Sequence, residues 1–341
     1  MLAALMLPAA AKAAEQPQFR EQIEVARLLI DARVVDRSGN ALLGLTVEDF
    51  RVLVDGQPAT LEAVEWVAGD VPYAEGLPPK EAEAVGAPVV PRGKIVVFFV
   101  QPDFQSVRLT GLMRMAPRAV EIIDRLQPQD LVAVLAFDFH LKLHLDLTTD
   151  HEAARRAVQA TQIFREPKVV VSSSPFSLFR HITHERALAT TSSEEAIALT
   201  GEALEKLPGA KIFVLLGWGL GTLHGRSGVF MGPHYARARA ALARARTSVL
   251  ALDITDADYH DLEVGLEKAA EDTGGFYVKT HQFPDQAVAR VTQALAGYYV
   301  LVVEKPPTYT GAHGITVELT RAKGEVLVRP VIVEQTTTTQ R

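Results

Sequence analysis

The feature that most constrains the fold is an alternation of short apolar runs with helix-period stretches between residues 94 and 296. The run over 94–100 is almost continuously apolar, which is typical of a strand buried on both faces of a parallel sheet. Similar runs predict strands at 131–137, 211–216, 248–253 and 276–278. Apolar residues at helical spacing predict helices at 109–126, 151–161, 194–207, 234–245, 259–273 and 284–296. The pattern predicts an α/β domain with a doubly wound, mostly parallel sheet and helices on both faces.

Two flanking segments have a different pattern. Residues 22–68 alternate short β-type runs with turns such as 36–40, and residues 297–334 return to the same pattern. Neither segment is long enough to close a sandwich alone, so we expect the two to pair as one small β-sandwich into which the α/β domain (94–296) is inserted. Residues 69–93 indicate a linker, because they are rich in Pro, Gly, Ala and Glu without periodicity. The polar residues 335–341 are expected to form a tail.

Composition limits the classes of function. With 48% hydrophobic and 22% charged residues, the chain has the balance of a folded globular protein rather than of a disordered one. The formal net charge of -6 gives no electrostatic reason to bind nucleic acid. The chain has no cysteine, which excludes disulfides, thiolate zinc sites and thiol nucleophiles.

The first residues predict export. Residues 1–11 are apolar, and Ala11-Lys12-Ala13 precedes Ala14 in the small-x-small pattern that a signal peptidase cleaves. We interpret residues 1–21 as the remnant of a secretory signal or a disordered end, and expect a periplasmic or secreted protein. No stretch reaches the about 18 to 20 continuous apolar residues that a membrane span requires, so no span is expected.

Several local motifs recur along the chain in a definite order. Residues 44–56 read GLTVEDFRVLVDG, and residues 127–134 read QPQDLVAV at the expected second strand, followed by TTD at 148–150. The segment LPGAK at 207–211 precedes a buried run, and residues 269–275 end in Thr-Gly-Gly. Together these motifs resemble a group of bacterial von Willebrand factor A-related proteins, and their order and spacing fit that group over about residues 22–330.

The resemblance implies a possible metal site at the carboxyl ends of the strands. In that family a D-x-S-x-S motif follows the first strand, a Thr comes from a later loop and an Asp follows the fourth strand; such oxygen ligands suit Mg²⁺. In this chain Gln101, Asp103 and Gln105 occupy the places of the Asp and the two Ser residues. A frame shifted by two places puts Asp103 first but leaves Gln105 and Val107 behind it.

The remaining ligand positions of the family are also poorly matched. After the fourth strand the chain has Gly217-Trp218-Gly219, which offers no carboxylate, and only Thr191 has the expected spacing to the next helix. The candidate metal ligands are therefore Asp103, Gln105 and Thr191. We expect a degenerate metal ion-dependent adhesion site without a cofactor, with Mg²⁺ as an alternative, and we expect Asp103 to cap the following helix or turn.

A protein-binding surface at the carboxyl edge of the sheet is the favoured function. Trp is enriched in binding hot spots, and Trp218 lies between two glycines at this edge, either as an exposed contact or as a lid over the site. A long, adaptable glycine-rich loop is expected beside it over 219–233. The predicted partner-binding residues are Gln101, Asp103, Gln105, Trp218 and Gly219. The partner is expected to be a protein, and its identity and the oligomeric state stay open.

Catalysis has no support in the motifs. The chain has no nucleophile elbow, no HExxH motif and no spaced pair of acids, so we predict a non-enzymatic interaction module. Two alternatives stay open: an Mg²⁺-dependent adhesion domain with a non-standard site, and a hydrolase of unknown type. A metal cluster could be formed by His260 with Asp253, Asp256, Asp258 and Asp261, but the segment Asp253-Ile254-Thr255-Asp256 follows the fifth strand, which favours a cap on the next helix. His181 and His184 lack a third zinc ligand in sequence, which favours solvated loop residues.

Overall fold

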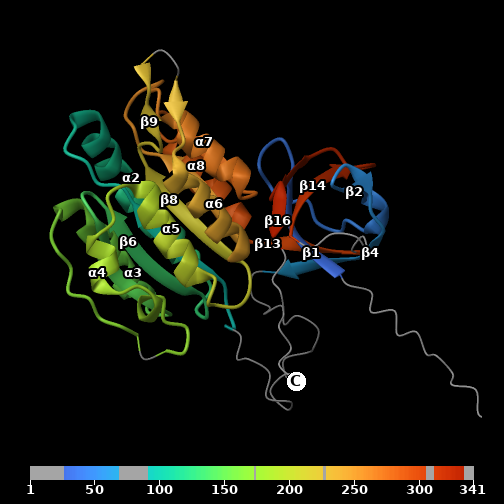
Figure 1. The fold of residues 1–341 in the computed structure, drawn as a ribbon, viewed down its shortest axis with the longest axis horizontal. Coiled ribbons are helices and arrows are strands. Elements are labelled where there is room, and N and C mark those ends of the chain that lie inside the picture. The colour runs from blue at the N-terminus through green and yellow to red at the C-terminus, as the bar shows by residue number, and fades with distance from the viewer. Residues whose placement is uncertain (1–26, 69–90, 173, 226–227, 305–310, 334–341) are drawn as a thin grey trace, which may run out of the picture.

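The computed structural model describes residues 27–68, 91–172, 174–225, 228–304 and 311–333 (Figure 1). The predicted signal remnant, most of the predicted linker and the predicted tail lie outside these residues. Across the described part of the chain, no helix is long and apolar enough to cross a membrane.

The larger part of the fold is built on one sheet of six strands. In chain order these are β5 (Ile95–Val100), β6 (Leu131–Phe137), β7 (Leu141–Thr148), β8 (Lys211–Gly217), β11 (Thr247–Asp253) and β12 (Phe276–Lys279). Their order in the sheet is β12-β11-β8-β5-β6-β7. β5 lies in the middle with β6 and β8 parallel to it on either side, and β11 and β12 extend the parallel sheet beyond β8. The chain winds outward from β5 in both directions, which confirms the doubly wound, mostly parallel sheet and places a switch point at the carboxyl ends of β5 and β8.

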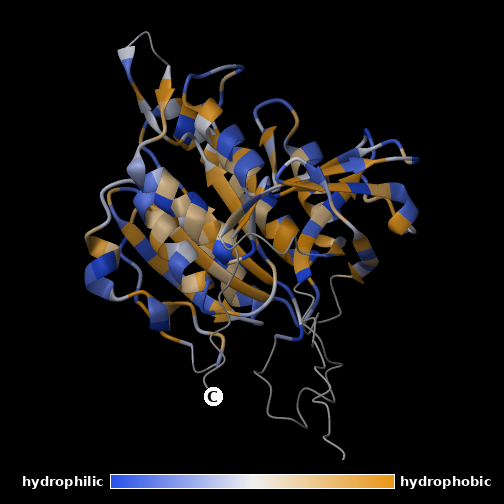
Figure 2. Cartoon of the chain, turned by 45° about the vertical axis from the view of Figure 1, so that its right-hand side comes forward, coloured by the Kyte–Doolittle hydropathy of each residue, from blue (hydrophilic) through white to orange (hydrophobic). Residues whose placement is uncertain are grey.

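The inner strands are apolar because both faces of the sheet are covered. Every residue of β5, β6, β8 and β11 is buried. Successive side chains of β5 enter opposite cores, with Phe99 in one apolar cluster and Phe98 in the other. Figure 2 shows these strands in the apolar colour between helices with mixed surfaces.

Helices cover the two faces of this sheet in separate groups. One apolar core includes residues of α2 (Ser106–Asp124), α3 (His151–Ala160) and α8 (Pro284–Leu295). The other includes residues of α4 (His184–Leu188), α5 (Ser193–Leu204), α6 (Pro233–Arg244) and α7 (Glu263–Asp272). The sequence predicted six of these seven helices, with ends that differ by a few residues; α4 was missed.

The smaller part of the fold combines strands from both sides of the α/β segment. One sheet has the order β15-β1-β13-β4, and the other has the order β16-β14-β2-β3. The first contains β1 (Arg27–Val35), β4 (Leu61–Ala68), β13 (Gly297–Glu304) and β15 (Glu325–Val328). The second contains β2 (Phe50–Val54), β3 (Gln57–Pro58), β14 (Ala312–Leu319) and β16 (Val331–Val333).

These two sheets share one apolar core. β1 pairs antiparallel with β13, and β2 pairs antiparallel with β14, so each sheet joins segments that are more than two hundred residues apart in the chain. Ile30 and Tyr299 from the first sheet belong to the same buried cluster as Val52 and Val317 from the second. In Figure 1 these strands lie to the right of the larger α/β part.

Candidate functional site: the carboxyl edge of the parallel sheet

Gln101 lies at the switch point, directly after β5, and its side chain is fully buried with 0% exposure. Its Nε2 donates to Ser193 Oγ at 2.7 Å and to the Gly219 carbonyl at 3.0 Å. Its Oε1 accepts from the backbone N–H of Trp218 at 2.9 Å. One amide thus joins the loop after β5, the start of α5 and the loop after β8.

Two of the predicted partner-binding residues are buried. The Gln101 side chain has its donors and acceptor satisfied inside the protein and offers no exposed surface. Gly219 is also buried, and a Cβ at this position would lie 2.5 Å from Leu262 Cβ. In this structure both residues hold the loops of the edge together.

Gly217 shows why no carboxylate stands after the fourth strand of the sheet. A Cβ built at this residue would lie 2.5 Å from Gln101 Oε1 and 3.2 Å from the Leu215 side chain. No side chain fits at this position while Gln101 occupies its present place. The two departures from the family's metal motif, at 101 and at 217, are therefore coupled through one contact.

Asp103 is held by its own turn and by an arginine. Its Oδ1 accepts from the backbone N–H of Gln105 at 2.7 Å, which confirms the expected turn cap. Its Oδ2 pairs with Arg108 Nη1 at 2.6 Å. The Arg108 guanidinium in turn lies 3.6 Å from the centroid of the Trp218 ring, so Asp103, Arg108 and Trp218 form one stack at the edge.

Trp218 is half-buried rather than fully exposed. One side of the ring packs against the apolar core that contains α2, α3 and α8, and Arg108 covers it. Its Nε1 is buried and has no hydrogen-bond partner in the described part of the chain. The lid reading of this residue therefore describes its surroundings better than the exposed-contact reading does.

The three candidate metal ligands have different surroundings. Thr191 is exposed and its Oγ1 donates to Glu195 Oε2 at 3.0 Å. Gln105 is exposed and forms the N-terminal cap position of α2 without a side-chain bond to that helix. Within the described residues, no hydrogen bond links the side chains of Asp103, Gln105 and Thr191 to one another.

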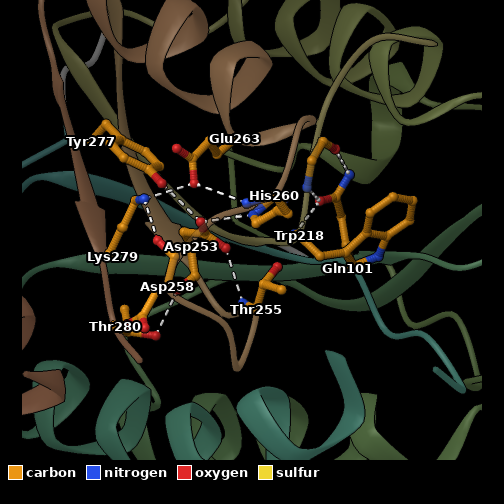
Figure 3. A network of polar contacts seen from close by, with 11 residues as sticks. Gln101, Trp218, Asp253, Thr255, Asp258, His260, Glu263, Tyr277, Lys279 and Thr280 are labelled. Carbon is orange, nitrogen blue, oxygen red and sulfur yellow. Dashed lines mark hydrogen bonds and ion pairs between the residues drawn. The ribbon is translucent and has the colours of Figure 1, made fainter. Parts of the chain in front are cut away.

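A second polar network lies beside Gln101, centred on Asp253 at the end of β11 (Figure 3). Asp253 is 2% exposed; its Oδ2 accepts from Tyr277 Oη at 2.8 Å and lies 2.9 Å from His260 Nε2. Its Oδ1 accepts from the backbone N–H of Thr255. Burial alone would raise the pKa of Asp253, but the hydrogen bonds from His260 and Thr255 outweigh burial and lower it.

The predicted helix cap at Asp253 is wrong. α7 begins only at Glu263, its N-cap is Leu262, and no side chain caps it. Asp253 instead fixes the loop between β11 and α7 by the bonds just described. The sequence did not show this role because its partners His260 and Tyr277 come from a loop and from the next strand.

Asp253, His260 and Glu263 also form the one group of three metal-ligating side chains found in the described residues, with ligand atoms within 4.8 Å of one another. Lys279 Nζ lies 2.8 Å from Glu263 Oε2, so an ammonium group already balances this carboxylate. Because His260, Tyr277 and Lys279 supply hydrogens or positive charge to both acids, the group is complete as a hydrogen-bonded network without a cation. His181 and His184 are exposed and belong to no such group.

A strongly exposed aromatic side chain in this part of the edge is one that the sequence analysis missed. Phe104 is 66% exposed and stacks on Phe164 with ring centroids 3.9 Å apart and planes 15° apart. Ile163, next to Phe164, is 68% exposed, and Val107 in the first turn of α2 is 42% exposed. We call Phe104, Val107, Ile163 and Phe164 the aromatic patch. The sequence did offer one sign of this patch, because Phe104 is a large apolar residue inside the degenerate metal motif.

The glycine-rich segment after β8 contains a short hairpin rather than only an irregular loop. β9 (Thr222–Leu223) pairs antiparallel with β10 (Val229–Phe230), and Figure 1 shows this ribbon extending away from the sheet. Gly221 at its base has φ +86°, and a Cβ there would lie 2.6 Å from Val229 Cγ1, so only glycine fits. Glu194 at the start of α5 accepts a hydrogen bond from the Gly221 N–H.

Comparison with known proteins gives distant structural likenesses. No family model matches the chain, and no curated protein matches it. The chain is similar to a von Willebrand factor type A protein from Catenulispora acidiphila, with 13% identity over 86% of this chain and 74% of that chain and a TM-score of 0.42.

For two further structures, the region similar to this chain spans most of the other protein. The von Willebrand factor domain of the type V pili tip protein Mfa5 from Porphyromonas gingivalis has 10% identity over 61% of this chain and 96% of that chain, with a TM-score of 0.41. The conserved hypothetical protein BatB from Bacteroides thetaiotaomicron has 16% identity over 59% of this chain and 98% of that chain, with a TM-score of 0.40. The fold assignment rests on strand order and register alone.

Proposed function

We propose that this protein is a non-enzymatic protein-interaction module that binds a protein partner at the carboxyl edge of its parallel sheet without a metal ion. The observation that carries the proposal is the buried amide of Gln101. It stands where the resembled family places its first metal ligand, and it joins by hydrogen bonds the loops that a metal ion would otherwise bring together.

Charge at the edge supports metal independence. A divalent cation needs several oxygen ligands, and carboxylates supply most of the charge that holds it. The Asp103 carboxylate is neutralised by Arg108, and Gly217 excludes a side chain at the fourth-strand position. The edge is therefore organised by an amide and an ion pair, both of which persist when divalent cations are removed.

The aromatic patch is the proposed contact surface. Aromatic side chains bury a large area at low entropic cost and are enriched where partners bind most strongly. Phe104 is held in one orientation by its stack on Phe164, so little conformational freedom is lost when a partner covers it. Gln105 and Asp103 provide polar groups at the rim of the patch.

Thermal unfolding of the purified chain in EDTA and in about 1 mM Mg²⁺ tests the metal-independent part of the proposal. A cation that binds only the folded state with a dissociation constant near 10 μM would add about 2.7 kcal/mol at that concentration. We expect no shift of the midpoint. A clear upward shift with Mg²⁺ would replace this proposal with the Mg²⁺-dependent adhesion alternative.

Site-specific photocrosslinking tests the contact surface. A photoreactive phenylalanine analogue at 104 should capture a discrete partner from an extract of the native host, equally in EDTA and in Mg²⁺. Leu43 is a matched control, because it is also 66% exposed but lies in the flanking β segment. Crosslinks of equal yield from 43 and 104, or a product at 104 that an Asp103→Ala and Phe164→Ser variant captures unchanged, would count against the edge as the interface.

Two organisational proposals accompany this function. We infer that the paired strands of 22–68 and 297–334 form one β-sandwich module that carries the α/β domain (94–296). Export to the periplasm or out of the cell stays a proposal based on the first residues. Mass determination of the mature N-terminus in the native host would test it.

A further inference from the structure

The six-stranded sheet ends at β7, on the side away from the flanking sheets. β12 at the other end borders the flanking strand β15, while β7 pairs only with β6 among the described strands. A segment beside β7, residues 165–172, reads REPKVVVS and belongs to no helix or strand. We call it the valine segment.

The valine segment is almost fully extended. Near its start, Glu166 Oε1 lies 3.2 Å from His140 Nε2, and at its end the Ser172 N–H donates to Asp146 Oδ2 at 2.7 Å. The runs 140–146 and 166–172 have the same number of residues. Because a strand rises about 3.3 Å per residue, close to the greatest reach of a chain, a segment that keeps pace with β7 must be nearly straight.

The main chain of the valine segment has no strand partner. Within the described part of the chain, the backbone N–H and carbonyl groups of residues 165–171 make no hydrogen bond. Val169, Val170 and Val171 are 42%, 71% and 48% exposed. Since successive side chains of an extended chain point to opposite faces, both faces of the segment are open to solvent. An extended, β-branched run with unpaired main-chain groups is suited to pairing with another strand.

The sequence of the segment is complementary to its own antiparallel copy. With Val170 opposite the partner's Val170, the three valines meet valines, and Lys168 at each end meets the neutral Ser172. Pro167, which has no N–H to donate, then lies outside the ladder. A register centred on Lys168 would instead set two ammonium groups face to face. The apolar centre and the uncharged opposite end therefore favour one register.

We propose that two copies of this protein pair through residues 168–172 as antiparallel strands related by a two-fold axis at Val170. Main-chain hydrogen bonds supply the affinity, as in other cases of strand addition, and the valines fix the register. So short a ladder makes a small interface, and we expect a dissociation constant on the order of 10 to 100 μM. The aromatic patch lies outside this ladder, and neither proposal requires the other.

Sedimentation velocity of the full chain between about 1 μM and about 500 μM tests for the dimer, and the wild type should shift from monomer to dimer over this range. Val170→Lys and Val170→Glu each place like charges on the axis and should each weaken the dimer at least about fivefold. An equimolar mixture of the two should restore it, because opposite charges then face each other. Val264→Lys is the control, since Val264 on α7 is also exposed, at 49%, but lies outside the ladder.

Disulfide trapping tests the register. The chain has no cysteine, so Val170→Cys carries a single thiol. Residues paired across an antiparallel ladder have Cα atoms about 4.5 to 5.5 Å apart, within the range of a disulfide. Val170→Cys should therefore form a covalent dimer on mild oxidation, and Leu43→Cys, at a position that is 66% exposed in a flanking segment, should not. Val169→Cys and Val171→Cys should crosslink when mixed and poorly when alone.

Four results would overturn the inference. They are a monomer at every concentration, dimerisation of Val170→Lys and Val170→Glu equal to the wild type, no recovery on mixing these two variants, and a covalent dimer from Val170→Cys no faster than from Leu43→Cys. A dimer that forms without the Val170→Cys crosslink would use another surface and would count equally against it. All variants change exposed residues, and a thermal unfolding curve verifies that each one is folded before association is compared.

Discussion

Replacing Asp31 by asparagine should lower the free energy of unfolding at neutral pH by about 3 to 5 kcal/mol, because it leaves buried guanidinium groups without a counter-charge. Asp31 lies on β1 and is 7% exposed. Its carboxylate pairs with Arg246 at 2.7 Å and with Arg329 at 2.9 Å. Arg246 immediately precedes β11, so the pair ties a flanking sheet to the α/β part.

The pH dependence isolates the smaller part of this effect that comes from ionisation of the Asp31 carboxyl. Burial alone would raise the pKa of Asp31, but Arg246 and Arg329 outweigh burial and hold it at about 2, against 3.8 for the unperturbed group. A shift of this size corresponds to about 2 kcal/mol. Because the folded pKa is depressed, this stability is fully present above pH 3.8 and is lost as the pH falls toward 2.

Urea unfolding of wild type and Asp31→Asn between neutral pH and about pH 2.5 measures both effects. The difference between the two proteins should be largest at neutral pH and should shrink on acidification by about 1 to 2 kcal/mol, because protonated Asp31 resembles asparagine. Glu62→Gln is the control, since its pair with Arg27 is exposed and should contribute less than about 1 kcal/mol. A difference below about 1 kcal/mol at neutral pH, or one that does not change with pH, would refute the reasoning.

Three further predictions concern the carboxyl edge, and each is checked by the free energy of unfolding in urea. Gln101→Leu should lower the free energy of unfolding by about 2 to 4 kcal/mol, because the Ser193 hydroxyl and the Gly219 carbonyl lose the hydrogen bonds that the amide now makes to them. Gly217→Ala should cost about 1 to 3 kcal/mol by pushing its Cβ into Gln101 Oε1, and a neutral result would show that the contact is soft. Trp218→Phe should be neutral or stabilising by about 1 kcal/mol, because it removes a buried N–H without a partner, whereas Trp218→Ala should destabilise; a large loss in the Phe variant would mean that this N–H is satisfied.

The inner strands of the sheet were predictable because strands buried on both faces have continuous apolar sequences. β6 and its ends follow from residues 131–137 alone. β7 was missed although its sequence, LKLHLDLT, alternates apolar and polar residues as a half-covered edge strand does. The search for parallel strands favoured continuous runs, so the antiparallel edge strand went unrecognised.

The site was predictable in its place but not in its geometry. The substitution at Gln101 was visible from the motif, yet its burial depends on Ser193 and Gly219, which come from distant loops. The sequence at position 101 would be the same whether the Gln101 side chain were exposed or buried and hydrogen-bonded to other loops. Asp253 was misread as a helix cap for the same reason, because its partners lie on a loop and on the neighbouring strand.

The pairing of Gly297 with Ala68 has a mechanical consequence. The α/β part leaves the flanking sheet after Ala68 and returns at Gly297, two residues that are direct neighbours across a strand ladder. Tension applied between Arg27 and Val333 would load the β1–β13 and β14–β16 ladders from their Arg27–Glu304 and Ala312–Val333 ends. The long excursion between them would bear no load until those ladders open pair by pair. The carboxyl edge would thus keep its shape under a pull that already strains the rest of the chain.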